Sequence, residues 1–330
     1  MWRFWAAAAA VVVLTTVVVF DNMAAVRGEP PPPPPAEHVV AVATTSQLKA
    51  ALLAVVPGDV VQLDDGTYSG RFVIARSGTP EAPITVRGSR AAVLDGGSLT
   101  SGYGLRVDHA ADLRLEGFTV SNSLKGIMAD GATRVQIANV EVSRIGDEGI
   151  HLRALSSDNV IRDSVVRLTG MSTPGFGEGI YIGSAMSNWG LHSAGLPDTS
   201  DRNQILNNKI LGTTGESIDI KEGSTGGIVR GNSFDGATMA NDQSADSWVD
   251  VKGNGYLIEA NRGENAVMDG FQTHVQLAGW GRDNVLRANV ATVNGPGYGF
   301  AVDPRAPAIV ACDNVVTAAA MGFANVACTP

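Results

Sequence analysis

Cysteine is scarce in this sequence, and its basic residues never cluster. Cys312 and Cys328 are the two cysteines. With no histidine nearby they do not indicate a zinc site, and in an oxidising compartment we expect a disulfide that closes the C-terminal tail. The formal net charge is −9 and no run of Lys or Arg appears, so we expect no nucleic-acid partner.

Aromatic residues (6%) and charged residues (17%) are also few, whereas the chain holds 39 glycines. This balance disfavours a helical bundle and indicates β-structure with many turns. The hydrophobic content of 44% excludes a disordered chain. About 290 residues follow the N-terminal segment, which predicts one long repetitive domain or two ordinary ones.

The N-terminal segment has no apolar run that reaches the ~20 residues of a membrane-spanning helix. Its longest such run, Ala6–Phe20, follows a single basic residue, Arg3. We interpret residues 1–27 as a signal peptide, with an uncleaved anchor left open. Residues 28–37 contain a proline tract and form a stiff linker. We therefore expect a secreted protein that contacts a membrane only if the segment stays uncleaved.

A four-residue element recurs along the rest of the chain: a small residue, an apolar residue, any residue, and another apolar residue. Asparagine, or once serine, follows each copy at the end of a second strand, mostly at intervals of 24–29 residues. The main copies are Gly149-Ile150-His151-Leu152, Gly179-Ile180-Tyr181-Ile182, Ser217-Ile218-Asp219-Ile220 and Trp248-Val249-Asp250-Val251. The polar positions are Asn139, Ser164, Asn208, Asn232, Asn261, Asn289 and Asn314.

This period predicts a parallel β-helix, because alternation within each unit indicates strands and 22–25 residues suffice for one turn of several short strands. The asparagines would stack at ~4.8 Å and share amide hydrogen bonds as a ladder. The N-terminus fits this architecture. Thr44 and Gln47 have capping-box spacing, and Leu48, Leu52 and Val55 form one apolar stripe. A short helix there would cap the open end of the stack.

Alternation also predicts which side chains leave the core. If Ile218 and Ile220 face inward, Asp219 and Lys221 face solvent, and the same holds one turn later for Asp250 and Lys252. Stacked turns then produce two polar columns beside a set of acidic residues that precede the strands. The first column is His151, Tyr181, Asp219, Asp250 and Gln272, the second is Arg153, Gly183, Lys221, Lys252 and His274, and the acidic set includes Glu148, Glu178 and Glu216.

One turn carries an insertion of about 20 residues, from Ser184 to Asp201, and long loops in compact repeats are often functional. It contains Trp189, and aromatic faces suit sugar rings. The alternative is that the outward columns are ordinary cross-strand ion pairs and that the tryptophan packs within its loop.

The opening of the repeat region resembles a known family. The segments Pro57-Gly58-Asp59-Val60-Val61-Gln62-Leu63, Gly66-Thr67-Tyr68 and Ala82-Pro83-Ile84-Thr85-Val86 are similar to the start of secreted right-handed parallel β-helix proteins of the pectin-lyase-like superfamily, particularly its chondroitin and alginate lyases. The resemblance implies an all-β fold, a single-stranded right-handed parallel β-helix over residues 38–330, and a lyase that acts on acidic polysaccharides.

The chemistry that fits is β-elimination on a uronic-acid polysaccharide. A bound Ca²⁺ would neutralise the substrate carboxylate, and Glu178, Glu216 and Asp219 offer the hard oxygen ligands it prefers. Lys221, and next to it Lys252, would take the proton with a pKa lowered by neighbouring positive charge. The expected substrate-binding residues are Arg153, Tyr181, Trp189, Asp250 and His274.

This assignment departs from the pattern of those lyases, since Lys221 follows the second carboxylate by two residues and the next turn carries Lys252 where the family has arginine. Three alternatives therefore stay open. A C5-epimerase would remove the same proton, a glycosidase could use Asp219 and Asp250, and a non-catalytic β-helix would only bind glycans or act as a surface spacer. We expect a monomer whose partner is an acidic polysaccharide.

Overall fold

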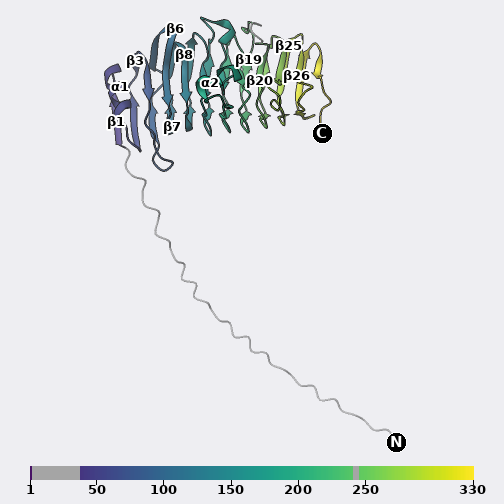
Figure 1. The fold of residues 1–330 in the computed structure, drawn as a ribbon, viewed down its shortest axis with the longest axis horizontal. Coiled ribbons are helices and arrows are strands. Elements are labelled where there is room, and N and C mark those ends of the chain that lie inside the picture. The colour runs from purple at the N-terminus through teal and green to yellow at the C-terminus, as the bar shows by residue number, and fades with distance from the viewer. Residues whose placement is uncertain (2–37, 241–244) are drawn as a thin grey trace. The chain divides into compact units, whose positions relative to one another are not determined.

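Short parallel strands wind through three columns to form a solenoid (Figure 1). The computed structural model describes Met1, residues 38–240 and residues 245–330. Apart from Met1, the expected signal segment (1–27) and linker (28–37) lie outside the described residues. Within the described ranges, no helix is both long enough and apolar enough to cross a membrane.

The first column is an eleven-stranded sheet in which each strand pairs in parallel with its counterpart in the next turn. Its strands are β1 (His38–Val42), β2 (Asp59–Leu63), β5 (Ile84–Arg87), β7 (Ala111–Glu116), β9 (Thr133–Ala138), β12 (Val160–Arg162), β15 (Gln204–Leu206), β18 (Ile228–Arg230), β21 (Leu257–Glu259), β24 (Val285–Arg287) and β27 (Ile309–Val310).

The second and third columns are joined near their start, because two long strands, β6 (Ala92–Asp108) and β8 (Thr119–Asp130), run through both. The second column continues with β3 (Gly66–Ser69), β10 (Glu141–Ile145), β13 (Val165–Arg167), β16 (Lys209–Leu211), β19 (Ser233–Asp235), β22 (Arg262–Glu264), β25 (Val290–Gly295) and β28 (Val315–Ala319). The third contains β4 (Phe72–Ile74), β11 (Ile150–Arg153), β14 (Ile180–Ile182), β17 (Ile218–Ile220), β20 (Ser247–Val251), β23 (Asp269–Thr273), β26 (Tyr298–Val302) and β29 (Gly322–Ala324).

The third column has the register that the repeat predicts. Ile150 pairs with Ile180, which pairs with Ile218, and this apolar row continues through Val249 to Phe271. All five side chains are buried in one continuous core. The outward row pairs in the same order, from His151 through Tyr181, Asp219 and Asp250 to Gln272. The predicted fold, an all-β right-handed parallel β-helix, is confirmed.

The asparagine ladder exists over five turns of the solenoid. Each member donates its side-chain Nδ2 to the Oδ1 of the next at 3.0 Å. The members are Asn208, Asn232, Asn261, Asn289 and Asn314. One turn before Asn208, the backbone N–H of Ser164 donates to the Oδ1 of Asn208. Asn139 was wrongly placed in this ladder: its side chain is exposed and accepts from Arg90, because the ladder position in that turn belongs to Val140, whose N–H donates to Ser164.

Both ends of the solenoid carry features that the sequence predicts. The helix is α1 (Thr45–Ala54), which begins with the capping box of Thr44 and Gln47 and buries Leu48 and Leu52. Its role as a cap stays a prediction. The disulfide between Cys312 and Cys328 is present near the C-terminus. The other helical segments are α2 (Trp189–His192) and two 3₁₀ turns, Pro174–Phe176 and Met186–Asn188.

Candidate functional site

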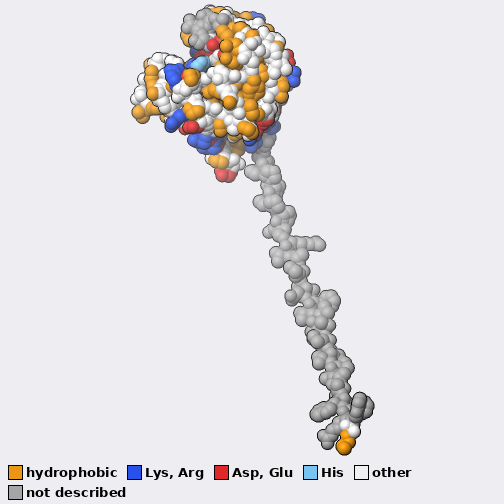
Figure 2. Space-filling view, turned by 90° about the vertical axis from the view of Figure 1, so that its right-hand side faces the viewer, with side chains coloured by type: hydrophobic (Ala, Val, Ile, Leu, Met, Phe, Trp, Pro, Cys, Tyr) orange, Lys and Arg blue, Asp and Glu red, His pale blue; other side chains and the backbone are white. Residues whose placement is uncertain are grey.

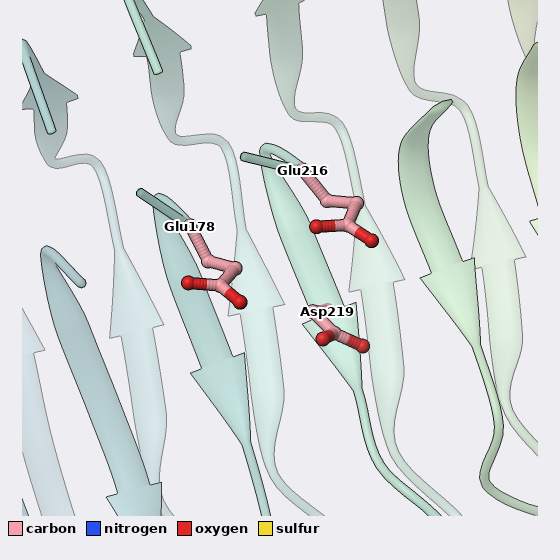
Figure 3. Close-up of side chains that lie close together, drawn as sticks. All are labelled: Glu178, Glu216 and Asp219. Atoms are coloured by element: carbon pink, nitrogen blue, oxygen red, sulfur yellow. The ribbon is translucent and has the colours of Figure 1, made fainter. Parts of the chain in front are cut away.

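Three carboxylates converge on adjacent turns of the third column (Figure 3). Glu178 and Glu216 precede β14 and β17, and Asp219 lies within β17. The period of the solenoid thus brings Glu178 next to Asp219, although the two are 41 positions apart in the sequence. One oxygen of each lies within 4.8 Å of the others, and all three side chains are buried. The structure therefore assembles the set that the sequence predicts as metal ligands.

Two of these carboxyl groups resist ionisation. Burial, followed by the charges of Asp219 and Glu148, raises the pKa of Glu178 to about 8. Burial and the charge of Asp219 also raise the pKa of Glu216 well above its ordinary value. Oε2 of Glu178 is buried without a hydrogen-bond partner. An unpartnered oxygen within a cluster of three carboxylates suits a hard divalent cation such as Ca²⁺, so the donor set fits the ion expected from the sequence.

Two lysines ion-pair with the third carboxylate of this cluster. Lys221 pairs with Oδ2 of Asp219, and Nζ of Lys252 lies 2.9 Å from Oδ1. Burial lowers the pKa of each ammonium, but the negative charge of Asp219 outweighs it, and both pKa values lie above the usual range of lysine. The prediction that Lys221 has a lowered pKa is therefore wrong for the protein without ligands, because the nearest charge is a carboxylate and not a cation.

Asp250 extends the charge network into the next turn. Its carboxylate accepts from Lys252 and, through the other oxygen, from Nδ1 of His274 at 2.8 Å. Burial opposes ionisation, but Lys252 and His274 together hold the pKa of Asp250 below its usual range. The hydrogen bond to Asp250 in turn raises the pKa of His274. Both carboxylate oxygens of Asp250 thus accept hydrogen bonds within the protein, although the sequence predicts Asp250 as a substrate-binding residue.

Tyr181, on the preceding turn, lies beside Lys221. Nζ of Lys221 is 5.0 Å from the centroid of the Tyr181 ring, and His151 packs edge-on against the same ring with centroids 4.2 Å apart. Burial, and then the charge of Asp219, raises the pKa of Tyr181 well above its ordinary value. The phenol therefore keeps its proton at neutral pH, with the Lys221 ammonium over its ring.

Two adjoining cavities line this face, and Glu178 borders both. The main cavity, of about 380 Å³, is bordered by most of the predicted site residues. They are Glu178, Glu216, Asp219, Lys221, Asp250, Lys252 and His274. The side cavity, of about 260 Å³, takes in Arg153 and Tyr181. Figure 2, which faces the C-terminal end of the solenoid, shows basic (Lys or Arg) and His side chains between a projecting lobe and the body.

The inserted segment supplies one wall of these cavities. Ala185, Met186 and Ser187 border the main cavity, while Asn188 and His192 border the side cavity. Asp198 anchors the insertion by accepting from the backbone N–H of Leu155 at 2.8 Å and from Ser184.

Trp189 also serves this anchoring. Its Nε1 donates to the carbonyl oxygen of Ser184 at 2.9 Å, and its side chain is buried. It borders neither cavity; the ring that the sequence predicts as a sugar platform lies against Gly223 of the next turn, where an added Cβ would come within 3.2 Å of it.

Lys125 borders the side cavity but is not among the site residues predicted from the sequence. Lys125 ion-pairs with Glu148 and lies 3.5 Å from Asp147. Although burial acts in the opposite direction, His151 and Lys125 lower the pKa of Glu148 to about 2, in contrast to Glu178 one turn later. The signal was available, because Lys125 precedes Gly126-Ile127 just as Glu148 precedes Gly149-Ile150.

Comparisons with known proteins agree with this architecture. A protein-family model described as "Right handed beta helix region" matches residues 78–238. The structure of an alginate lyase from Paenibacillus sp. str. FPU-7 is similar with a TM-score of 0.83 and 38% sequence identity, covering 88% of this chain and 99% of that chain. No curated protein sequence matches.

More distant structures share the fold alone. Pectate lyase Pel9A has a TM-score of 0.64 at 15% identity, covering 88% of this chain and 79% of its own. A rhamnogalacturonan lyase has a TM-score of 0.55 at 13% identity, covering 83% and 80%. The protein is thus a right-handed parallel β-helix of the pectin-lyase-like type. It belongs to the family that contains the Paenibacillus alginate lyase, and its structural neighbours include other polysaccharide lyases.

Proposed function

We propose that this protein is a polysaccharide lyase that cleaves alginate, or a closely similar uronic-acid polymer, by Ca²⁺-assisted β-elimination. The observation that carries the proposal is the 38% identity to an alginate lyase over 99% of that chain. The site supports it, because a lysine, a tyrosine and a carboxylate cluster border joined cavities. We also propose that the protein acts outside the cytoplasm, where such polymers occur.

Lys252 and His274 would bind the substrate carboxylate. Two N–H groups of the Lys252 ammonium are used by Asp219 and Asp250, which leaves a third to donate toward the cavity. When protonated, His274 donates through Nδ1 to Asp250 and keeps Nε2–H for a ligand. These donors withdraw charge from the carboxylate and so make the C5 proton of that sugar more acidic.

Lys221 and Tyr181 would carry the proton transfers. The C5–H bond breaks and its proton passes to Nζ of Lys221, a C4–C5 double bond forms, and the C4–O4 bond breaks while the Tyr181 hydroxyl gives its proton to O4. When bound, Ca²⁺ would take up the charge of Glu178, Glu216 and Asp219 and leave Lys221 free to act in its neutral form. Proton exchange between Lys221 and Tyr181 restores both groups, since they lie side by side.

The test is the ultraviolet absorbance of unsaturated uronide ends, measured on purified protein with alginate, pectate, glucuronan and chondroitin. We expect the absorbance to rise with alginate. We expect K221A to lose activity at least about 100-fold, as removal of a proton-transfer group does. K209A is the matched control, because Lys209 is an exposed lysine on β16 of the same turn and borders neither site cavity.

A flat absorbance trace with every polymer, from protein shown to be folded, would reject the lyase. Proton NMR of alginate incubated with the protein would then distinguish the alternatives. Exchange or inversion at C5 without cleavage would indicate an epimerase. Binding without either change would indicate a non-catalytic glycan-binding protein.

A further inference from the structure

A third cavity, of about 440 Å³, continues the candidate site toward the C-terminus. It lies between the turn that follows β23 and the turn that follows β26, and Gln276 borders both this cavity and the main one. Trp280, Arg282 and Arg305 contribute its large side chains. Nothing in the mechanism proposed above uses these three residues.

The turn that carries Trp280 is held in place by its backbone. Gly281 has a φ of +77°, and a Cβ at this position would lie 2.2 Å from the carbonyl oxygen of His274. Only glycine allows that approach. Asn254 of the preceding turn donates to the carbonyl oxygen of Gly279 at 3.0 Å and accepts from the N–H of Arg282 at 3.1 Å. The backbone that carries Trp280 is therefore held at the cavity, and the Trp280 side chain is half-buried there.

Arg305 is positioned by a carboxylate that joins the two turns. Asp303 accepts from Nε and Nη2 of Arg305 at 2.9 and 2.6 Å and also accepts from the N–H of Val275 at 3.0 Å. A guanidinium has five N–H donors, and this pair uses two of them. The Arg305 side chain is 66% exposed, so the remaining donors are available to a ligand in the cavity.

We propose that this third cavity is a distal subsite that binds a further uronate unit of the same polysaccharide, with Trp280 against the sugar ring and Arg305 and Arg282 on its carboxylate. The inference rests on the proposed function. Amphipathic aromatic rings pack against the apolar face of sugars, and a guanidinium fork matches a carboxylate. The tryptophan ring and the guanidinium groups together favour an acidic sugar over a neutral one.

The subsite implies a direction for the polymer. Two pairing steps separate β17, which Lys221 directly follows, from β23, whose following turn carries Trp280, and both steps pass through β20. At ~4.8 Å per step this is ~10 Å along the axis of the solenoid. The side cavity with Arg153 lies on the opposite side of the main cavity. The polysaccharide therefore runs parallel to the axis, and only oligomers that extend ~10 Å beyond Lys221 reach Trp280.

The experiment compares kcat/KM on alginate polymer with kcat/KM on an alginate trisaccharide, for the wild type and for W280A, W280F, R305Q and R262A. We expect the polymer-to-trisaccharide ratio to fall about tenfold in W280A and R305Q and to be largely retained in W280F. R262A is the control, because Arg262 is equally exposed (63%), pairs with a carboxylate two residues away, Glu264, and borders none of the three cavities. Melting temperatures establish that each variant is folded.

The outcomes separate the two proposals. A wild type that cleaves alginate, with a ratio in R305Q and W280A equal to that of R262A, overturns the subsite and leaves the lyase intact. A wild type that neither cleaves nor binds alginate polymer in affinity electrophoresis overturns both. If W280A is unfolded, R305Q decides the matter, since its exposed side chain is not part of the core.

Discussion

Lys252 and Asp219 form an ion pair across adjacent turns, with 2.9 Å between Nζ and Oδ1 and 33 residues between them in the chain. The same carboxylate also holds Lys221 through its other oxygen. Asp219 thus holds both lysines, Lys221 and Lys252, in position. Because all three side chains are largely buried, their charges interact strongly and cannot be removed singly without cost.

Replacing this shared carboxylate should affect both activity and stability. D219N leaves two nearly buried ammonium groups without their common counter-ion, and we expect the free energy of unfolding to fall by about 3 kcal/mol. Urea denaturation measures this change. D163N is the control, because Asp163 pairs with Arg162 at the surface and should contribute less than about 1 kcal/mol. Equal effects of the two substitutions would contradict the role of Asp219.

Ca²⁺ should stabilise the protein through the three carboxylates. An ion that binds only the folded state raises the melting temperature, and saturation at 100 times its Kd adds about 2.7 kcal/mol. We expect CaCl₂ to raise the melting temperature of the wild type relative to EDTA, and to have little effect on E216Q. Differential scanning fluorimetry provides the measurement. A shift of the same size in E216Q would place the ion elsewhere, and no shift in the wild type would argue against this cofactor.

The pair of His274 and Asp250 should make stability depend on pH. The hydrogen bond to Asp250 raises the pKa of His274 above its ordinary 6.5; burial opposes this, Lys252 lowers it, and Asp246 raises it. The stabilisation is therefore complete below pH 6.5 and is lost as the pH rises through the higher pKa of the folded state.

Melting temperatures recorded from pH 5.5 to 8.5 test this dependence. We expect the wild type to lose more stability over this range than H274Q. Other groups, including Glu178, titrate in both proteins, so their contribution cancels in the difference. H109Q is the control substitution, because His109 is an exposed histidine whose partner is Asp108 at the surface and it lies outside the site. Parallel curves for the wild type and H274Q would refute the assignment.

The asparagine ladder should be intolerant of charge. Asn261 donates Nδ2 to Asn289 and to the carbonyl oxygen of Val229, and in N261D both acceptors would face a buried carboxylate that has no N–H. We expect N261D to lower the free energy of unfolding by more than about 2 kcal/mol. The exposed Asn139, which lies outside the ladder, should tolerate N139D within about 0.5 kcal/mol. Chemical denaturation of the two variants should therefore give clearly different midpoints.

The register of the solenoid could be predicted from the sequence, because it depends on local alternation repeated at a fixed interval. If Ile218 and Ile220 are buried, Asp219 must point outward, and stacking then aligns Tyr181, Asp219 and Asp250. The same reasoning placed the carboxylates of Glu178 and Glu216 beside Asp219. The error at Asn139 was a shift of one residue in the turn between β9 and β10, where Val140 and not Asn139 holds the ladder position.

What each group does in the site was decided by the tertiary structure, because long side chains reach across turns and their pKa depends on which partner they meet. Lys221 turns toward Asp219, so that its pKa rises where the sequence suggested a decrease. Lys125 neutralises Glu148, while no lysine in the described structure pairs with Glu178, so two equivalent glutamates differ in ionisation. Trp189 is directed inward by a hydrogen bond to Ser184 within the insertion. The periodic sequence determines where a residue lies along the solenoid, but packing and charge between turns determine what it contacts.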